Sequence, residues 1–183
     1  MATHHLAPLA EPRGAPSRYS RPPLPAYRHV PGLTPHPVSH PAGHSYGLEE
    51  PTPSVSCREL PGSWRQCEEF LYGVDLFNRA YLWEAHESWE MVWIGAGKTT
   101  VPALFVQGLV QTAAALLRWH LGTPAGAISL LAKAGGRFEP AEQLLAASGD
   151  SSYMGLAVES WRGSVEDYAR EGAATFPFLR LGM

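Results

Sequence analysis

The sequence predicts an all-α protein, a compact bundle of about six helices with an extended Pro/His-rich N-terminal arm. Two observations support this fold class. Apolar residues recur at helical spacing from about residue 63 onward, and no segment has a convincing strand pattern. Residues 1–62 instead hold 13 of the 17 prolines and six of the eight histidines, and no helical period survives there. A chain of 183 residues is long enough for one domain with a substantial core.

The expected helix ends follow from capping residues, prolines and glycines. Ser63 with Gln66 three residues later matches a capping box and opens the first helix. Thr100, with Pro102 in the first turn, opens the third helix. Thr123 and Pro124 have the residue types of an N-cap and a first helical position and open the fourth. The glycine pair at 135–136 is expected to end that helix. The predicted helices span residues 63–79, 82–94, 100–121, 123–134, 140–147 and 152–170.

The proline-rich region divides into two parts. Residues near the N-terminus have the composition of a flexible tail. The following segment contains Tyr27, Val30, Leu33 and Tyr46, which a low-complexity linker does not need, so we expect it to pack on the helices. The predicted organisation is a flexible tail at 1–23, an extended packed arm at 24–62, a helical domain at 63–171 and a C-terminal tail at 172–183.

A weak internal repeat relates two pairs of helices. In each pair, small residues mark the expected helix crossing and a larger residue follows. The matching positions are offset by 42 residues: Gly73, Ala85 and Trp89 in the first pair, and Ala115, Ala127 and Leu131 in the second. Two units are too few for a solenoid, so we predict a compact bundle built on two tetratricopeptide-like helical hairpins.

Charge and composition restrict the partners and the compartment. The net charge of −3 argues against non-specific binding to nucleic acid, which favours a basic surface. The most apolar run, residues 101–117, is shorter than a membrane span of about 20 residues, and the N-terminus lacks the apolar core of a signal peptide. Cys57 and Cys67 have no zinc-site spacing and are expected to be reduced thiols. We therefore expect a cytoplasmic protein whose partner is a small molecule or a metal ion, with self-association into a homo-oligomer left open.

The segment YLWEAHESWEMVW, residues 81–93, is the most informative in the chain. At about 100° per residue, one face of this helix is an apolar seam and is expected to be buried. His86 and Glu90 lie on the flank of the seam, Glu87 lies next to them, and Glu84 is expected on the more exposed side. Acids and an imidazole beside a buried seam need a partner, because such groups are costly to bury alone. The seam consists of Leu82, Ala85, Trp89 and Val92.

The following helix supplies a candidate partner. Gln107, Gln111 and Arg118 form one polar stripe on an otherwise apolar helix. One alternative is a structural network, in which Arg118 pairs with Glu87 or Glu90 and the glutamines bond to His86. The other alternative is a pocket in which these residues bind a ligand or a metal ion.

In the pocket alternative, His86 and Glu90 could ligate one metal at i, i+4 spacing. The sequence HExxE lacks the second histidine of a zincin helix, so a further ligand must come from elsewhere, and the arm histidines are the obvious source. A hydrolytic role would use Glu87 or Glu90 as acid or base. The predicted site is catalytic Glu87 and Glu90; ligand-binding Glu84, Gln107, Gln111 and Arg118; and His86, Glu90, His36 and His44 for a divalent metal ion.

Three segments resemble a known family. GVDLFNRAYLWEAHESWEMVW, QGLVQTAAALL and GTPAGAISLLAKA are similar to the bacterial and archaeal family catalogued as domain of unknown function 309, over roughly residues 68–138. The resemblance implies a small helical bundle with no established activity. Members place histidines just after the AAAL run, where this chain has Leu117 and Arg118, with His120 slightly later. The family's recurring polar residues correspond to Glu84, His86, Glu87, Glu90, Gln107 and Gln111.

Two functions from different classes remain open at this stage. The first is a helical protein that binds a metal ion or a small ligand and that could be hydrolytic. The second is a non-enzymatic, tetratricopeptide-like interaction module in which the polar network is purely structural.

Overall fold

A computed structural model describes residues 9–49, 51–171 and 175–182. Within these residues the chain forms helices and an isolated bridge between Tyr153 and Leu156, with no strand, which confirms the all-α class. The helices are α1 (Val55–Arg58), α2 (Glu68–Asn78), α3 (Leu82–Gly95), α4 (Val101–His120), α5 (Pro124–Ser148) and α6 (Val158–Glu171).

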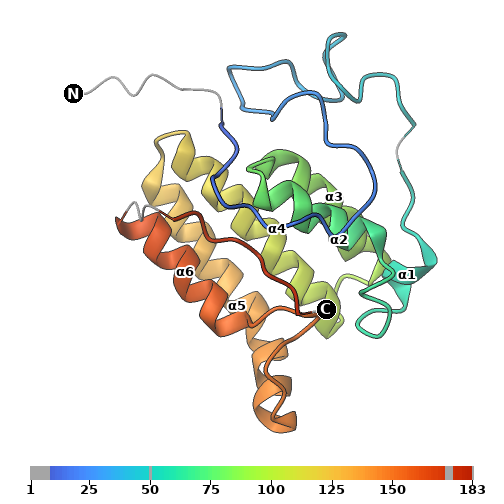
Figure 1. The fold of residues 1–183 in the computed structure, drawn as a ribbon, viewed down its shortest axis with the longest axis vertical. Coiled ribbons are helices and arrows are strands. Elements are labelled where there is room, and N and C mark those ends of the chain that lie inside the picture. Colours follow the sequence, from blue (N-terminus) through green and yellow to red (C-terminus); the bar gives the residue numbers. More distant parts are fainter. Residues whose placement is uncertain (1–8, 50, 172–174, 183) are drawn as a thin grey trace.

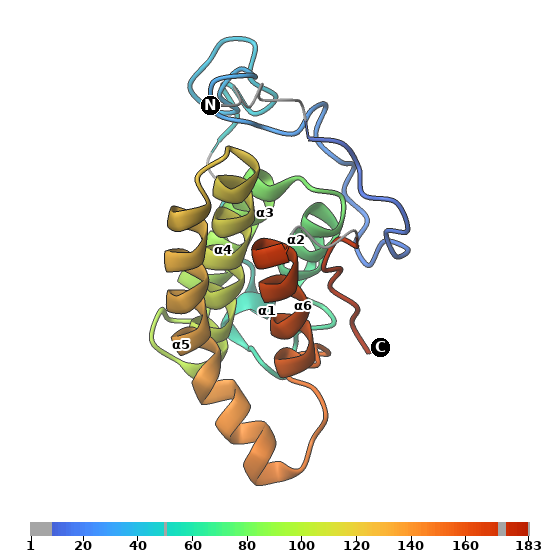
Figure 2. The ribbon, with the colours of Figure 1, turned by 90° about the vertical axis from the view of Figure 1, so that its left-hand side faces the viewer.

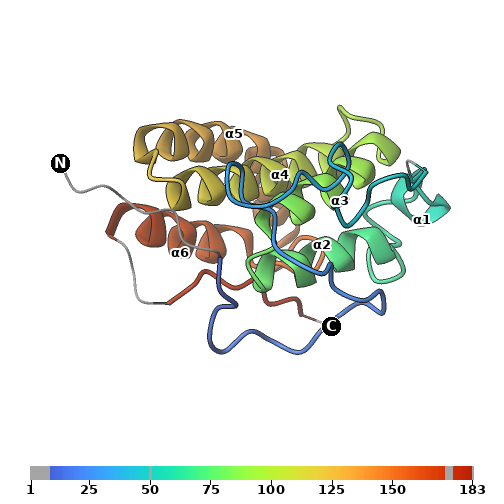
Figure 3. The same ribbon diagram turned by 90° about the horizontal axis from the view of Figure 1, so that it is seen from above.

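The longer helices pack as a bundle in which neighbours in sequence are neighbours in space. α2 packs on α3, α3 on α4, α4 on α5 and α5 on α6. In Figure 1 and Figure 3, α4 lies between α3 and α5. The last helix returns to the first part of the bundle, because the rings of Phe77 in α2 and Trp161 in α6 lie 5.9 Å apart between centroids. The arrangement encloses one core.

α4 is the central helix. Thr100 caps its N-terminus by accepting a hydrogen bond from the backbone N–H of Ala103, as the sequence pattern indicates. By length and composition alone α4 could cross a membrane, but 67% of its most apolar window is buried inside the fold. A β-carbon on Gly108 would lie 2.6 Å from the ring of Phe138, so the glycine allows α5 to approach closely.

The seam predicted for α3 is buried, which confirms the assignment of this helix face. Trp89 and Ala85 are both 0% exposed. The small residue that receives the Trp89 indole lies on α2 rather than in the alanine run of α4. A β-carbon on Gly73 would lie 2.2 Å from the indole nitrogen, and that nitrogen donates a hydrogen bond to the carbonyl of Phe70. The Trp89 indole therefore packs α3 closely against α2.

Two predicted helix starts are wrong. α2 begins at Glu68 rather than at residue 63, because Ser63 donates its hydroxyl proton to the carbonyl of Ser56 instead of capping a helix. α6 begins at Val158 rather than at residue 152, because the backbone reverses direction at Gly155, where φ is +79°.

The predicted stop at residues 135–136 is also wrong. α5 continues through both glycines and through Pro140 to Ser148, and its end projects past the neighbouring helices (Figure 1 and Figure 2). A β-carbon on Gly135 would lie 3.0 Å from the guanidinium of Arg162. The missing side chain at this position therefore allows close contact between α5 and α6, and packing overrides the low helix propensity of glycine.

The segments at both ends contact the bundle through buried polar groups of α2. The carboxylate of Asp75, which is 0% exposed, accepts hydrogen bonds from the backbone N–H groups of Tyr19 and Ser20. These two residues belong to the predicted flexible tail, of which residues 1–8 lie outside the described part. In the predicted C-terminal tail, Leu179 is buried. Its backbone N–H donates to the side-chain oxygen of Asn78 at 2.7 Å, and its carbonyl accepts from the side-chain nitrogen of Asn78 at 2.8 Å.

Candidate functional site

The structure brings three of the predicted site residues together on α3. His86 Nδ1 lies 3.3 Å from Glu87 Oε1, and His86 Nε2 lies 3.6 Å from Glu90 Oε1. One potential ligand atom from each residue lies within 4.8 Å of the other two. The imidazole also packs against the Trp83 indole, with the ring centroids 5.9 Å apart. The three side chains thus form a compact His/Glu cluster at the edge of the bundle, which we call the His86 cluster.

The charge of His86 responds to both burial and its neighbours. Burial lowers the pKa of His86, but the contact with Glu87 and the charges of Glu90 and Glu87 outweigh burial and raise this pKa above its usual value. The approach to Glu87 is an ion-pair contact rather than a well-aligned hydrogen bond, because Nδ1 has no hydrogen-bond partner within the described residues. The fold therefore favours the protonated form of His86. One ring nitrogen faces Glu87 and the other faces Glu90.

We expect His86→Gln to reduce the pH dependence of stability. The unfolded chain has a histidine pKa of about 6.5, and the folded value is higher, so the stabilisation by His86 is complete below about pH 6 and is lost as the pH rises through the folded pKa. Urea unfolding of both proteins between about pH 5 and pH 8.5 measures the effect. The difference in unfolding free energy between wild type and variant should shrink as the pH rises. A difference that stays constant over this range would contradict the expectation.

Glu84 is buried, and the prediction that it lies on the more exposed side of α3 is wrong. Its side chain is 6% exposed because the arm covers it. Glu84 Oε1 accepts a hydrogen bond from the backbone N–H of His29 at 2.8 Å and lies 3.2 Å from His44 Nε2, while Oε2 is buried with no partner among the described residues. Burial raises the pKa of Glu84 and outweighs the hydrogen bonds that lower it. Sequence periodicity could not show this, because the covering residues lie more than 35 positions away.

Two of the arm histidines, His29 and His36, lie around Trp83 rather than around His86. The rings of His29 and His36 lie 4.9 and 5.4 Å from the Trp83 ring, measured between centroids. Burial lowers the pKa of His29, and the charge of His36 adds to this effect. Because Trp83 also contacts His86, its indole links the His86 cluster to the arm. Neither His36 nor His44 contributes a ligand atom to the cluster in the described residues.

The predicted polar stripe of α4 does not contact the His86 cluster directly. No hydrogen bond or ion pair in the described part of the chain joins Gln107, Gln111 or Arg118 to His86, Glu87 or Glu90. Arg118 is exposed near the C-terminal end of α4. The pairing of Arg118 with Glu87 or Glu90, predicted in the structural alternative, is therefore absent. Gln111 Oε1 is buried without a hydrogen-bond partner among the described residues.

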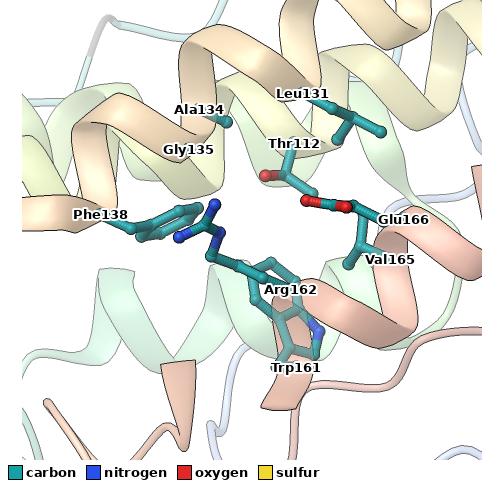
Figure 4. Close-up of a pocket in the computed structure, with 9 residues that line it drawn as sticks. All are labelled: Thr112, Leu131, Ala134, Gly135, Phe138, Trp161, Arg162, Val165 and Glu166. Carbon is teal, nitrogen blue, oxygen red and sulfur yellow. The ribbon is translucent and has the colours of Figure 1, made fainter. Parts of the chain in front are cut away.

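Two hollows lie elsewhere in the fold. One lies between α4, α5 and α6 (Figure 4), where Arg162 points toward Phe138 and forms an ion pair with Glu142 at 2.6 Å. Its volume of about 10 Å³ is no larger than a single water requires. A second hollow, of about 410 Å³, lies between the ends of α4 and α6 and residues 9–13. None of the predicted site residues lines either hollow.

Comparison with known proteins gives one match. Residues 70–130 match the family model described as Domain of unknown function (DUF309), which confirms the resemblance over this stretch. The matched region contains all of α3 and α4, and with them the His86 cluster. Neither a curated protein nor a solved structure matches the chain. The similarity of the two helical hairpins to tetratricopeptide units stays a prediction.

Proposed function

We propose that this chain, which carries a DUF309 domain at residues 70–130, binds a divalent metal ion on α3 through His86 and Glu90. The observation that carries the proposal is the convergence of ligand atoms from His86, Glu87 and Glu90 within 4.8 Å of one another. The side chains of Glu87 and Glu90 are 48% and 42% exposed, so an ion can reach them from solvent without opening the fold.

The three residues have different roles in this proposal. His86 Nε2 faces Glu90, and these two groups are the ligands, at the i, i+4 spacing that places two side chains on one helix face. Glu87 Oε1 lies 3.3 Å from Nδ1, the other ring nitrogen, and a small rotation of its side chain would let it accept a hydrogen bond from Nδ1–H of the neutral imidazole. Such a carboxylate orients a metal-bound histidine and raises its basicity. Trp83 packs against the ring and restricts its rotation.

One imidazole and one carboxylate suit zinc, manganese or iron in the divalent state. Two protein ligands leave several coordination positions for water or a substrate group, so exchangeable binding is expected rather than a closed structural site. The hydrolytic role predicted for Glu87 and Glu90 depends on such a metal-bound water. Metal binding is therefore the first property to test.

The test is calorimetric titration of the full chain, produced without a histidine tag, with zinc or manganese salts. We expect one ion per chain, with affinity that increases with pH because the metal competes with a proton on His86. His86→Ala and Glu90→Gln should abolish binding. Glu87→Gln should weaken binding by about tenfold or more, as expected when the group that orients a ligand is lost.

His40→Ala is the matched control, because this arm histidine is exposed and its Nδ1 accepts a local hydrogen bond from the backbone N–H of Ala42. Binding by His40→Ala should equal that of the wild type. If the wild type binds neither metal, or binds equally well without His86, the proposal is wrong. The alternative of a non-enzymatic interaction module, with the His86 cluster as surface ion pairs, would then be favoured.

A further inference from the structure

Two cysteines that sequence spacing leaves unrelated meet in the structure. Cys57 lies in α1 and Cys67 immediately precedes α2, and both side chains are 0% exposed. Their sulfur atoms are 3.1 Å apart. Both residues lie outside the DUF309 match and away from the His86 cluster. Their proximity therefore needs an explanation of its own.

The thiol pair lies at the junction of three elements. Gly95 at the end of α3 is so close that a β-carbon there would lie 2.7 Å from Cys57 Cβ. On the other side, the hydroxyl of Ser54 lies 3.4 Å from Cys57 Sγ. Glu69 in α2 accepts hydrogen bonds from the backbone N–H and the hydroxyl of Ser54, at 3.2 and 3.0 Å. The pair thus joins α1 to α2 beneath the C-terminal end of α3.

The geometry favours a covalent link over a metal. Zinc with bonds of about 2.3 Å to each sulfur in a tetrahedral site separates the two sulfurs by about 3.8 Å. The two sulfurs are already closer than that, and the third possible ligand, Glu69 Oε2, lies 3.8 Å from Cys67 Sγ and also accepts a hydrogen bond from Ser54. A disulfide bond of about 2.05 Å requires the sulfurs to approach by only about 1 Å.

The two thiols differ in acidity. The hydrogen bond from Cys67 lowers the pKa of Cys57 and outweighs the effect of burial, whereas the same contact raises the pKa of Cys67. A thiolate is the nucleophile in thiol–disulfide exchange. Cys67 Sγ also lies 3.8 Å from the Glu69 carboxylate, which disfavours a thiolate at that position. We therefore assign Cys57 as the attacking residue and Cys67 as the residue that completes the exchange.

We propose that Cys57 and Cys67 form a reversible dithiol–disulfide pair that fastens α1 to the start of α2. The oxidant is a low-molecular-weight disulfide. Because both thiols are buried, the four-residue helix α1 must open locally before the exchange. The Cys57 thiolate then attacks one sulfur of the small disulfide, forms a mixed disulfide and releases one small thiol. Cys67 then loses its proton and attacks Cys57 Sγ, which releases the second small thiol. Two electrons and two protons pass from the protein to the small disulfide.

The disulfide closes a short loop from residue 57 to residue 67, which restricts the unfolded chain and stabilises the fold. For a loop of this length and a chain of this size, the melting temperature should rise by about 5–10 °C. Because Gly95 packs against Cys57, the link also fixes the end of α3.

The test uses the full chain under native conditions with oxidised glutathione as the oxidant. Free thiols are then blocked by alkylation, and the intact mass and tryptic peptides are measured. We expect a loss of two hydrogen masses, a peptide pair joined through Cys57 and Cys67, and a higher melting temperature that dithiothreitol reverses. Cys57→Ser and Cys67→Ser are the matched controls, with the corresponding alanine variants if serine prevents folding. The Cys67 variant should retain one glutathione on Cys57.

Three results would overturn the proposal. In the first, both thiols stay free in the folded protein although they oxidise after unfolding. In the second, wild-type protein accumulates a stable glutathione adduct instead of the internal link. In the third, the protein purifies with one zinc ion that either single variant loses, which would assign the thiols to a metal site.

Discussion

Trp89→Ala is expected to lower the free energy of unfolding by about 3–5 kcal/mol, the range for removal of a large aromatic side chain from a core. Trp89 is 0% exposed, and its ring lies 5.9 Å from the ring of Phe77, measured between centroids. Gly73 leaves the space that the indole fills. An alanine would leave this space empty and would remove the hydrogen bond that the indole donates to the carbonyl of Phe70.

Urea denaturation followed by circular dichroism measures this loss. Trp93→Ala is the matched control, because Trp93 lies one helical turn further along α3, is only partly buried and donates to the carbonyl of Lys98. Its replacement should cost clearly less than that of Trp89. A cost for Trp89→Ala of under about 1 kcal/mol would contradict the packing described for α2 and α3.

Asp75→Ala is the second change with a large expected effect, a loss of about 3–5 kcal/mol of stability, because it removes one side of a buried charged network. The carboxylate accepts hydrogen bonds from two backbone N–H groups and from the Ser20 hydroxyl, at 2.6–3.1 Å. It also pairs with Arg18 at 3.5 Å and with Arg79 at 3.9 Å. Without the carboxylate, these donors lose their acceptor and the two arginines lose their counter-charge.

The readouts are urea denaturation and the rate of tryptic cleavage after Arg18, where the next residue, Tyr19, is one of the two anchored residues. Cleavage should be faster in Asp75→Ala than in the wild type, because the N-terminal segment has lost its attachment to α2. Asp167→Ala, at an exposed position of α6, is the control and should change neither stability nor cleavage. Equal cleavage rates in the wild type and Asp75→Ala would show that this carboxylate does not hold the segment.

Hydrophobic spacing and capping residues predicted a helix correctly wherever tertiary packing agrees with the intrinsic preference of the segment. The seam of α3 and the limits of α4 followed from hydrophobic spacing and from Thr100 with Pro102. Errors in the predicted helix limits arose where a residue contacts another element that is far away in sequence. Gly135 suggested a helix end, but its lack of a side chain allows contact with Arg162 on another helix.

The candidate site was predictable only within a single helix. His86 meets Glu87 and Glu90 because residues one and four positions apart can approach each other on α3. The burial of Glu84 depends on His29 and His44, far away in sequence, and no periodicity contains that information. Asp75 was missed for the same reason, since the backbone N–H groups that donate to it lie 55 or 56 positions away.

The order in which the helices pack has a consequence for how the chain folds. Because each long helix packs on the next one in sequence, most of the bundle can assemble by closing short loops, which has a small entropic cost. Proteins dominated by such local contacts fold quickly. The hydrogen bonds that residues 19–44 form with α2 and α3 instead join residues 40 or more positions apart and require α2 and α3 to be already in place. The helical bundle should therefore form first, and the proline-rich segment should attach to it in a later and slower step.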